Sequence, residues 1–162
     1  MTILIKNGRL INPSENLDKV MDIFVEDGII KEKAESIEKQ ADTVIDAAGC
    51  YVMPGLIDLH VHFRDPGLTY KEDIETGSKA AAKGGFTTVC CMPNTKPVVD
   101  NVETVKYIIE KGEKTGLTNV LPVGAVTKNM AGVEITDVEE LKKGRNLCHK
   151  RRRQVSNELR CL

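Results

Sequence analysis

The 162-residue sequence lacks an apolar run long enough to span a membrane, and its first residues have neither a basic region nor an apolar leader. Its five cysteines are odd in number and include no C-x-x-C spacing, which argues against a disulfide framework. Adjacent Cys90 and Cys91 lie in an apolar run and are expected to be reduced core residues. No repeat or low-complexity segment is present. We therefore expect a cytoplasmic globular protein without a membrane partner.

The net charge of −1 conceals an asymmetry along the chain. Residues 144–162 hold six basic residues and one acidic residue, a net of +5, whereas the preceding residues hold 17 basic and 23 acidic ones, a net of −6. A basic tail is typical of a nucleic-acid or anionic-membrane contact. The run Arg151 to Arg153 has no neighbouring aromatic residue for base stacking, which disfavours nucleic acid as a partner.

Residues 1–53 are expected to form a small β domain. Asn7-Gly8 predicts a hairpin between strands at 2–6 and 9–11, and Asp27-Gly28 predicts a second turn. A further short strand is expected at 43–46.

From residue 54 to 143, strand and helix patterns alternate, which predicts an α/β chain built from βα units around a parallel sheet. Strands are expected at 56–63, 86–92 and 119–125, and helices at 70–83, from about 100 to 116, and at 136–143. The mostly apolar strand at 56–63 is expected to be buried on both faces. Asp100 and Glu103 predict a capping box at the start of the second helix, and Gly116 predicts its end.

His60-Val61-His62 is the sharpest chemical feature, because residues two apart on a strand project to the same side. Two imidazoles on one face make half of a divalent-metal site. Asp58 has the same parity, and sites in α/β barrels lie at the carboxyl ends of strands. The alternative is a pair of unrelated histidines on a strand.

Arg64 and Asn94 each follow a predicted strand, at the same end of the sheet. A guanidinium beside a metal site suits bidentate binding of a substrate carboxylate, and an amide can hydrogen-bond to the same ligand. A surface salt bridge for Arg64 and an ordinary turn for Asn94 remain the alternatives.

Several segments resemble bacterial class I dihydroorotases of the amidohydrolase superfamily, over residues 1 to about 143. The segments are Asp46-Ala47-Ala48-Gly49, Met53 to His62, His62 to Gly67, Tyr70 to Gly77, Gly84 to Val89 and Met92 to Pro97. The resemblance implies the N-terminal portion of that enzyme. The implied fold is an incomplete metal-dependent-hydrolase (β/α)8 barrel, about its first three βα units, preceded by a small β-sandwich-type unit. Three parallel strands alone would expose apolar surface and sheet edges.

The resemblance further implies a zinc hydrolase that interconverts N-carbamoyl-L-aspartate and L-dihydroorotate in pyrimidine biosynthesis. By this analogy His60 and His62 bind zinc, one or two ions in the complete enzyme, and His62, Arg64 and Asn94 bind the substrate. The family's acid/base aspartate lies beyond the chain end, so no catalytic residue is present, and the chain alone is expected to be inactive.

The alternatives are an allantoinase-like or hydantoinase-like amidohydrolase, or a non-catalytic subunit that partners aspartate carbamoyltransferase. A homo-oligomer is a further assembly that the resemblance allows. Residues 144–162 are expected to be out of frame, since a one-base shift at 148–154 can encode Ser-Glu-Asp-Gly. On that interpretation Arg152 replaces a metal-binding aspartate of the family, while His149 matches no family ligand.

Overall fold

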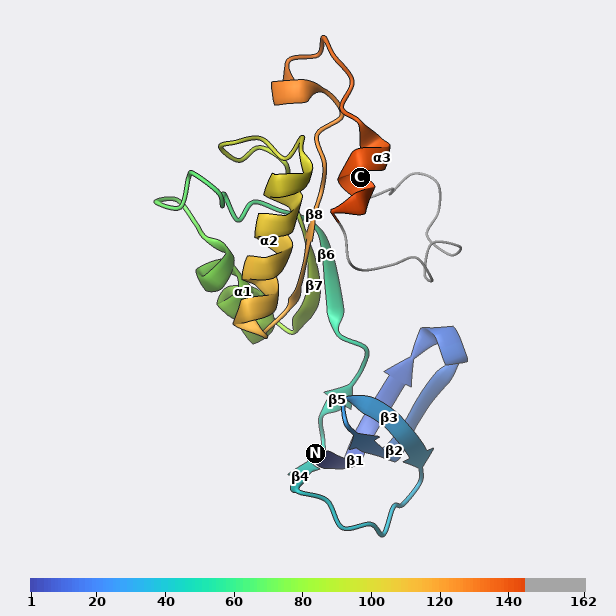
Figure 1. The fold of residues 1–162 in the computed structure, drawn as a ribbon. Helices are drawn as coiled ribbons and strands as arrows, with labels where there is room; N and C mark the ends of the chain where they lie inside the picture. The colour runs from blue at the N-terminus through green and yellow to red at the C-terminus, as the bar shows by residue number, and fades with distance from the viewer. Residues whose placement is uncertain (145–162) are drawn as a thin grey trace. The chain divides into compact units, whose positions relative to one another are not determined.

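The computed structural model describes residues 1–144 (Figure 1). The chain divides into two compact units, Met1–Pro54 and a second that begins at Gly55. The basic tail after Gly144 lies outside the described residues. The predictions for His149, for the run Arg151 to Arg153 and for a shifted frame at 148–154 therefore lie outside them too.

The first unit is one five-stranded sheet in the order β3-β2-β1-β4, with β5 also paired to β1. Its elements are β1 (Thr2–Asn12), the 3₁₀ turn η1 (Pro13–Glu15), β2 (Leu17–Glu26), β3 (Ile29–Ala34), β4 (Thr43–Asp46) and β5 (Tyr51–Val52). The β1–β2 and β2–β3 pairs are antiparallel, whereas β4 and β5 run parallel to β1. Leu4, Phe24 and Ile37 form its buried apolar cluster.

The hairpin predicted at Asn7-Gly8 is wrong, because β1 continues through these residues with a bulge. Ile5 pairs with Ile23 and Gly8 with Met21, so two residues of β1 oppose the single residue Asp22. Asn7 has a φ of 63°, and its N–H donates to Asp22 Oδ1 over 2.9 Å. Asn7 supplies the left-handed backbone that either a hairpin or a bulge can use, and the buried carboxylate opposite it favours the bulge.

The hairpin predicted at Asp27-Gly28 is confirmed, since these residues connect β2 to β3 with φ angles of 49° and 74°. Both central residues of the tightest hairpin turns need positive φ, which Asp and Gly accept.

The second unit has three parallel strands in the order β6-β7-β8, as the alternating pattern predicts. Its elements are β6 (Leu56–Val61), α1 (Ile74–Lys83), β7 (Phe86–Cys91), α2 (Val102–Thr115), β8 (Asn119–Pro122), the 3₁₀ turn η2 (Lys128–Met130) and α3 (Val138–Lys143). Helices α1 and α2 lie side by side against the sheet (Figure 1). The core between them includes Ile74, Val89, Val105, Ile108 and Leu141.

Helix ends differ from the sequence prediction where capping side chains decide them. Helix α1 begins at Ile74 rather than near Tyr70, because Asp73 accepts the Thr76 N–H over 2.8 Å. Helix α2 is capped by Asn101, not Asp100, and ends at Gly116 as predicted.

The predicted capping box of Asp100 and Glu103 is wrong, since Asn101 Oδ1 accepts the Thr104 N–H over 2.9 Å. The Asp100 carboxylate instead accepts the N–H of Asn129 over 2.7 Å.

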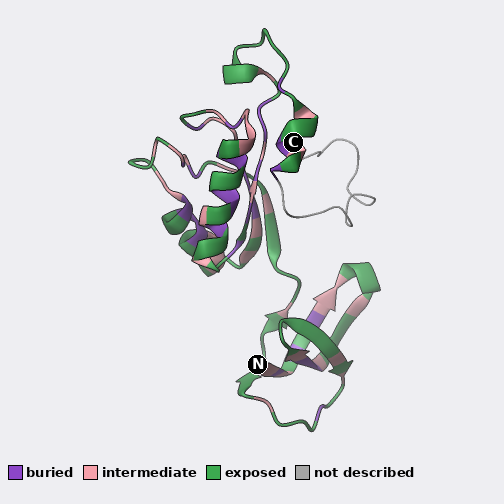
Figure 2. Ribbon diagram, viewed as in Figure 1, coloured by how far each residue is buried: buried purple, intermediate pink, exposed green. Residues whose placement is uncertain are grey.

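Strand β6 is not buried on both faces, contrary to the sequence prediction (Figure 2). Its Leu56, Ile57 and Leu59 are 45%, 61% and 46% exposed. This agrees with the apolar exposure expected of a few parallel strands at one side of an unclosed barrel. The neighbouring β7 buries Cys90 and Cys91, as predicted, and burial raises the pKa of the Cys91 thiol to about 12.

Candidate functional site

Strand β6 brings the two predicted histidines together at its carboxyl end. His60 lies within β6 and His62 directly after it, and both side chains are exposed. Their Nε2 atoms are 3.3 Å apart, with ring centroids 5.1 Å apart and planes inclined at 65°. The two nitrogens therefore converge on one point in front of the strand end.

The spacing of these nitrogens fits a shared tetrahedral metal ion. Two imidazole nitrogens bound to one tetrahedral zinc at about 2.05 Å stand about 3.3 Å from each other, the separation observed between His60 and His62. Among residues 1–144, no third histidine, cysteine or carboxylate joins them in a group. Within residues 1–144 the pair thus has the spacing of two ligands of one ion, but no complete metal site is formed.

Asp58, which shares the parity of the two histidines, has a local role in the structure. Its Oδ1 accepts the backbone N–H of His60 over 2.9 Å. The contact holds the strand end in shape beside the histidine pair.

Asn94 lies in the loop after β7 and contacts His62 directly. Its Oδ1 is 2.9 Å from His62 Nδ1, a contact in which the ring N–H donates to the amide oxygen. A proton on Nδ1 leaves Nε2 with its lone pair free, which is the form that binds a metal. Within residues 1–144 the Asn94 amide nitrogen makes no hydrogen bond.

Arg64 follows the histidine pair in an uncommon backbone conformation. Its φ is 60°, in the left-handed region that a non-glycine residue rarely adopts, and its carbonyl accepts the Leu68 N–H over 2.9 Å. Within the described chain no ion pair involves its guanidinium, which is partly exposed. Such conformations persist where the surrounding structure holds them, often at ligand sites.

The loops that carry Arg64 and Asn94 are joined backbone to backbone. The Lys96 N–H donates to Pro66 O over 2.9 Å. Gly67 has a φ of 88°, and a Cβ there would stand 1.8 Å from Lys96 O. Only glycine permits this approach, so the two predicted ligand-binding residues are held in one platform.

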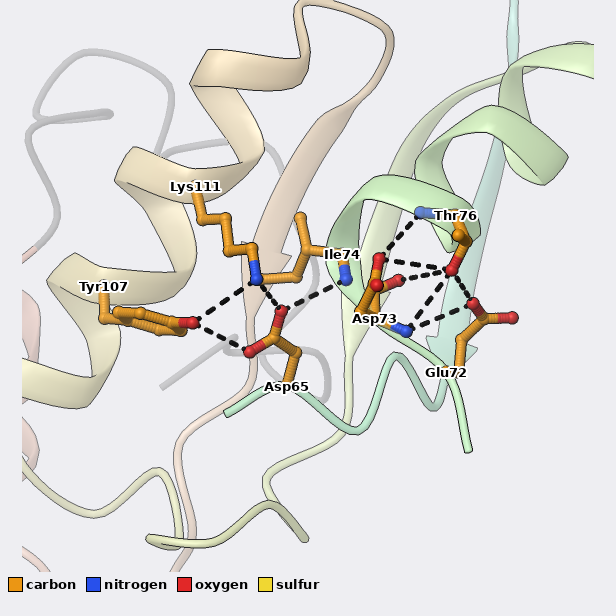
Figure 3. Close-up of polar contacts among 7 residues, drawn as sticks. All are labelled: Asp65, Glu72, Asp73, Ile74, Thr76, Tyr107 and Lys111. Carbon is orange, nitrogen blue, oxygen red and sulfur yellow. Dashed lines mark hydrogen bonds and ion pairs between the residues drawn. The ribbon is translucent and has the colours of Figure 1, made fainter. Parts of the chain in front are cut away.

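A cluster of polar side chains around the buried Asp65 was not predicted from the sequence (Figure 3). Asp65 accepts from Lys111 Nζ over 2.6 Å, from Tyr107 Oη over 2.9 Å and from the Ile74 N–H over 3.3 Å. The hydrogen bond from Lys111 to Asp65 raises the pKa of the lysine. The pKa of Tyr107 is raised chiefly by burial and further by its hydrogen bond to Asp65. Tyr107 and Lys111 lie one turn apart on α2, but no local pattern links them to Asp65.

A family model described as dihydro-orotase-like matches residues 49–155, the segment that contains this whole arrangement. The chain belongs to the dihydroorotase-like family. Curated relatives named dihydroorotase include those of Pelobacter propionicus, 51% identical over 143 residues, and Geobacter sulfurreducens, 54% identical over 143 residues. Each alignment covers 88% of this chain and 34% of the relative. The chain therefore spans about a third of the length of these dihydroorotases.

Solved structures confirm the predicted fold class for this member of the dihydroorotase-like family. An L-hydantoinase from Arthrobacter aurescens matches 87% of this chain and 30% of its own, with a TM-score of 0.68 and 29% identity. A D-hydantoinase from Thermus sp. matches 77% of this chain and 28% of its own, with a TM-score of 0.63 and 36% identity. The α/β chain is part of an amidohydrolase barrel.

Helices in the described part of this dihydroorotase-like chain are too short or too polar for any of them to cross a membrane.

Proposed function

We propose that this chain supplies the zinc-binding and carboxylate-binding end of a dihydroorotase, which interconverts N-carbamoyl-L-aspartate and L-dihydroorotate in pyrimidine biosynthesis. The observation that carries this proposal is the histidine pair at the carboxyl end of β6. Its Nε2 atoms are 3.3 Å apart, and Asn94 accepts the opposite ring proton of His62. The names of the relatives supply the reaction.

The roles follow from the chemistry of each side chain. His60 and His62 would hold zinc, which when bound lowers the pKa of a water ligand and polarises an amide carbonyl. The Arg64 guanidinium would bind the substrate carboxylate through two parallel N–H donors. Asn94 would orient His62 with its oxygen and donate to the substrate with its amide nitrogen.

The 162 residues alone are proposed to be inactive. Only two histidines converge in the described chain, and a catalytic zinc site has three protein ligands in its usual form. The complete enzyme would hold one or two zinc ions, and a second copy of the chain or aspartate carbamoyltransferase is a proposed partner.

The first experiment measures Co²⁺ binding to the full chain from its visible absorption. We expect the chain to bind Co²⁺. The H60A and H62A variants should lose at least about tenfold in affinity, since removal of even a hydrogen-bond partner of a ligand costs that much. The H149A variant removes the remaining histidine of the sequence and serves as the matched control. Equal affinity in wild type and H62A would exclude the metal site.

The second experiment distinguishes dihydroorotase from hydantoinase chemistry. Hydantoinase chemistry is the alternative, because two similar solved structures are hydantoinases. N-carbamoyl-L-aspartate or unsubstituted hydantoin is titrated into the chain by calorimetry. A carboxylate-binding Arg64 predicts that the R64A variant weakens binding of the carbamoyl amino acid more than binding of Co²⁺. Preference for hydantoin, with no effect of R64A, would favour the hydantoinase-like alternative.

A further inference from the structure

We propose that Lys111 is a positioning residue that keeps Asp65 from pairing with its chain neighbour Arg64, so that the Arg64 guanidinium is left for an anionic ligand. The ligand part of this role rests on the proposed carboxylate site. The separation of the Arg64 and Asp65 charges does not rest on that site, because it concerns only residues of this chain.

The Asp65 carboxylate is fully occupied from within the protein. Its side chain is 0% exposed, and three donors reach it: Lys111 Nζ, Tyr107 Oη and the Ile74 N–H (Figure 3). Two of these donors belong to α2 and one to the first turn of α1. The carboxylate is thus turned toward the helices.

Arg64 stands next to this carboxylate in the sequence, yet no ion pair joins the two within residues 1–144. The Asp65 carboxylate is fully buried against Lys111 and is not presented to the arginine beside it. Lys111 already supplies the positive charge, and its hydrogen bond to Asp65 raises its own pKa, so the lysine stays protonated at neutral pH.

Removal of the Lys111 charge would change this distribution. Asp65 would keep two neutral donors but lose its counter-charge, which leaves a buried carboxylate without a cationic partner. The adjacent Arg64 is then drawn toward Asp65, and its guanidinium is lost to a ligand. The effect requires the charge of Lys111 and not merely its side-chain volume.

The test follows the Arg64 Nε–Hε resonance of the full chain by NMR, assigned with the R64K variant. We expect K111M to shift this resonance and slow its exchange with water, as a guanidinium enters an ion pair. In K111M, N-carbamoyl-L-aspartate should bind about tenfold more weakly, the effect of exchanging one charge-assisted contact. K111R restores the charge and should restore both readouts.

The matched control is K79M on α1. Lys79 also forms a 2.6 Å ion pair with a carboxylate, that of Glu75, but both side chains are more than 60% exposed. We expect no change at Arg64 in K79M. The Y107F variant keeps the Lys111 charge and should likewise leave the Arg64 resonance in place.

A further variant tests the direction of cause. In the double variant K111M/D65N the buried charge is gone, so Arg64 should return to its wild-type resonance and affinity. Should K111M not fold, K111Q is measured in its place, because glutamine retains a donor for Asp65 without the charge.

An unshifted Arg64 resonance in folded K111M or K111Q overturns the proposal, as does an equal shift in Y107F or K79M. If wild type binds no carbamoyl aspartate, the proposed carboxylate site fails. The Arg64 resonance still decides the role of Lys111 in that case.

Discussion

Each unit of the chain buries one aspartate, and the two satisfy their charge in different ways. Asp22 in the first unit and Asp65 in the second are both 2% exposed. Asp22 accepts backbone N–H groups of Asn7 and Ile37 over 2.9 and 3.0 Å, with Lys6 Nζ more distant at 3.8 Å. Asp65 instead depends on the side chains of Tyr107 and Lys111 together with one N–H.

The backbone donors of Asp22 and the side-chain donors of Asp65 stabilise different parts of the structure. The donors of Asp22 belong to the bulge of β1 and to the segment that brings Ile37 into the core, so Asp22 maintains the sheet itself. The side-chain donors of Asp65 reach from α2 to the loop directly after Arg64. The second arrangement couples α2 to the loop that carries Arg64, and it is sensitive to the loss of a single side chain.

The largest expected difference comes from deleting the lysine of each pair. K111M removes the counter-charge of a carboxylate with no exposure, which costs about 3 kcal/mol or more in buried pairs. K6M should cost less than about 1 kcal/mol, because Asp22 keeps both N–H donors and the pair is long. Urea unfolding of both variants measures this, and equal losses would contradict the comparison.

Deleting the first unit's aspartate should have the next largest effect. D22A leaves the N–H of Ile37 buried without its acceptor, a loss of about 1–3 kcal/mol in the free energy of unfolding. Hydrogen exchange of the Ile37 amide should accelerate more than that of amides in β6. The exposed aspartate Asp18 provides the control variant D18A, for which a clearly smaller loss of stability than in D22A is expected.

The two units should respond to pH in opposite directions. Burial opposes ionisation of Asp22, but the N–H groups of Asn7 and Ile37 outweigh it and lower its pKa below 3.8. Its contribution to stability is therefore complete above pH 3.8 and is lost as the pH falls further. The pKa of Lys111 is raised above 10.5 by Asp65, so its contribution is complete below that pH and is lost as the pH rises through the raised value.

Amide hydrogen exchange, followed separately in each unit at acid and alkaline pH, measures how the stability of that unit changes with pH. D22N should flatten the acid slope in the first unit and leave the alkaline slope in the second. K111M should do the reverse, and a shared slope in both variants would contradict the separation.

The sequence was most informative where a pattern is local. Alternating apolar runs predicted the βα units, and the parity of His60 and His62 predicted their convergence on one side of β6. Asn7-Gly8 misled, because the same dipeptide suits a hairpin and a bulge, and the choice depends on Asp22 across the sheet. The burial expected for β6 failed because an apolar run does not reveal which of its faces is covered.

The contacts around the site were predicted less well than its residues. Arg64 and Asn94 could be placed at strand ends, but the contact of Asn94 with His62 depends on two loops joined at Gly67. Asp65 and Lys111 are 46 residues apart, and no spacing rule pairs them. Side-chain contacts between distant elements come from packing, which a single sequence does not display.

The smallest expected effect on stability comes from substitution of Asn94, in contrast to substitutions at the two buried aspartates. N94A removes the acceptor of the His62 ring proton at an exposed pair, so the free energy of unfolding should change by less than about 0.5 kcal/mol. Co²⁺ affinity should nevertheless fall about tenfold or more, because the ring is no longer held with Nε2 free for the metal. N94D, which retains an acceptor, should keep most of that affinity. A large stability loss in N94A with unchanged Co²⁺ binding would assign Asn94 to the scaffold, as Asp22 is.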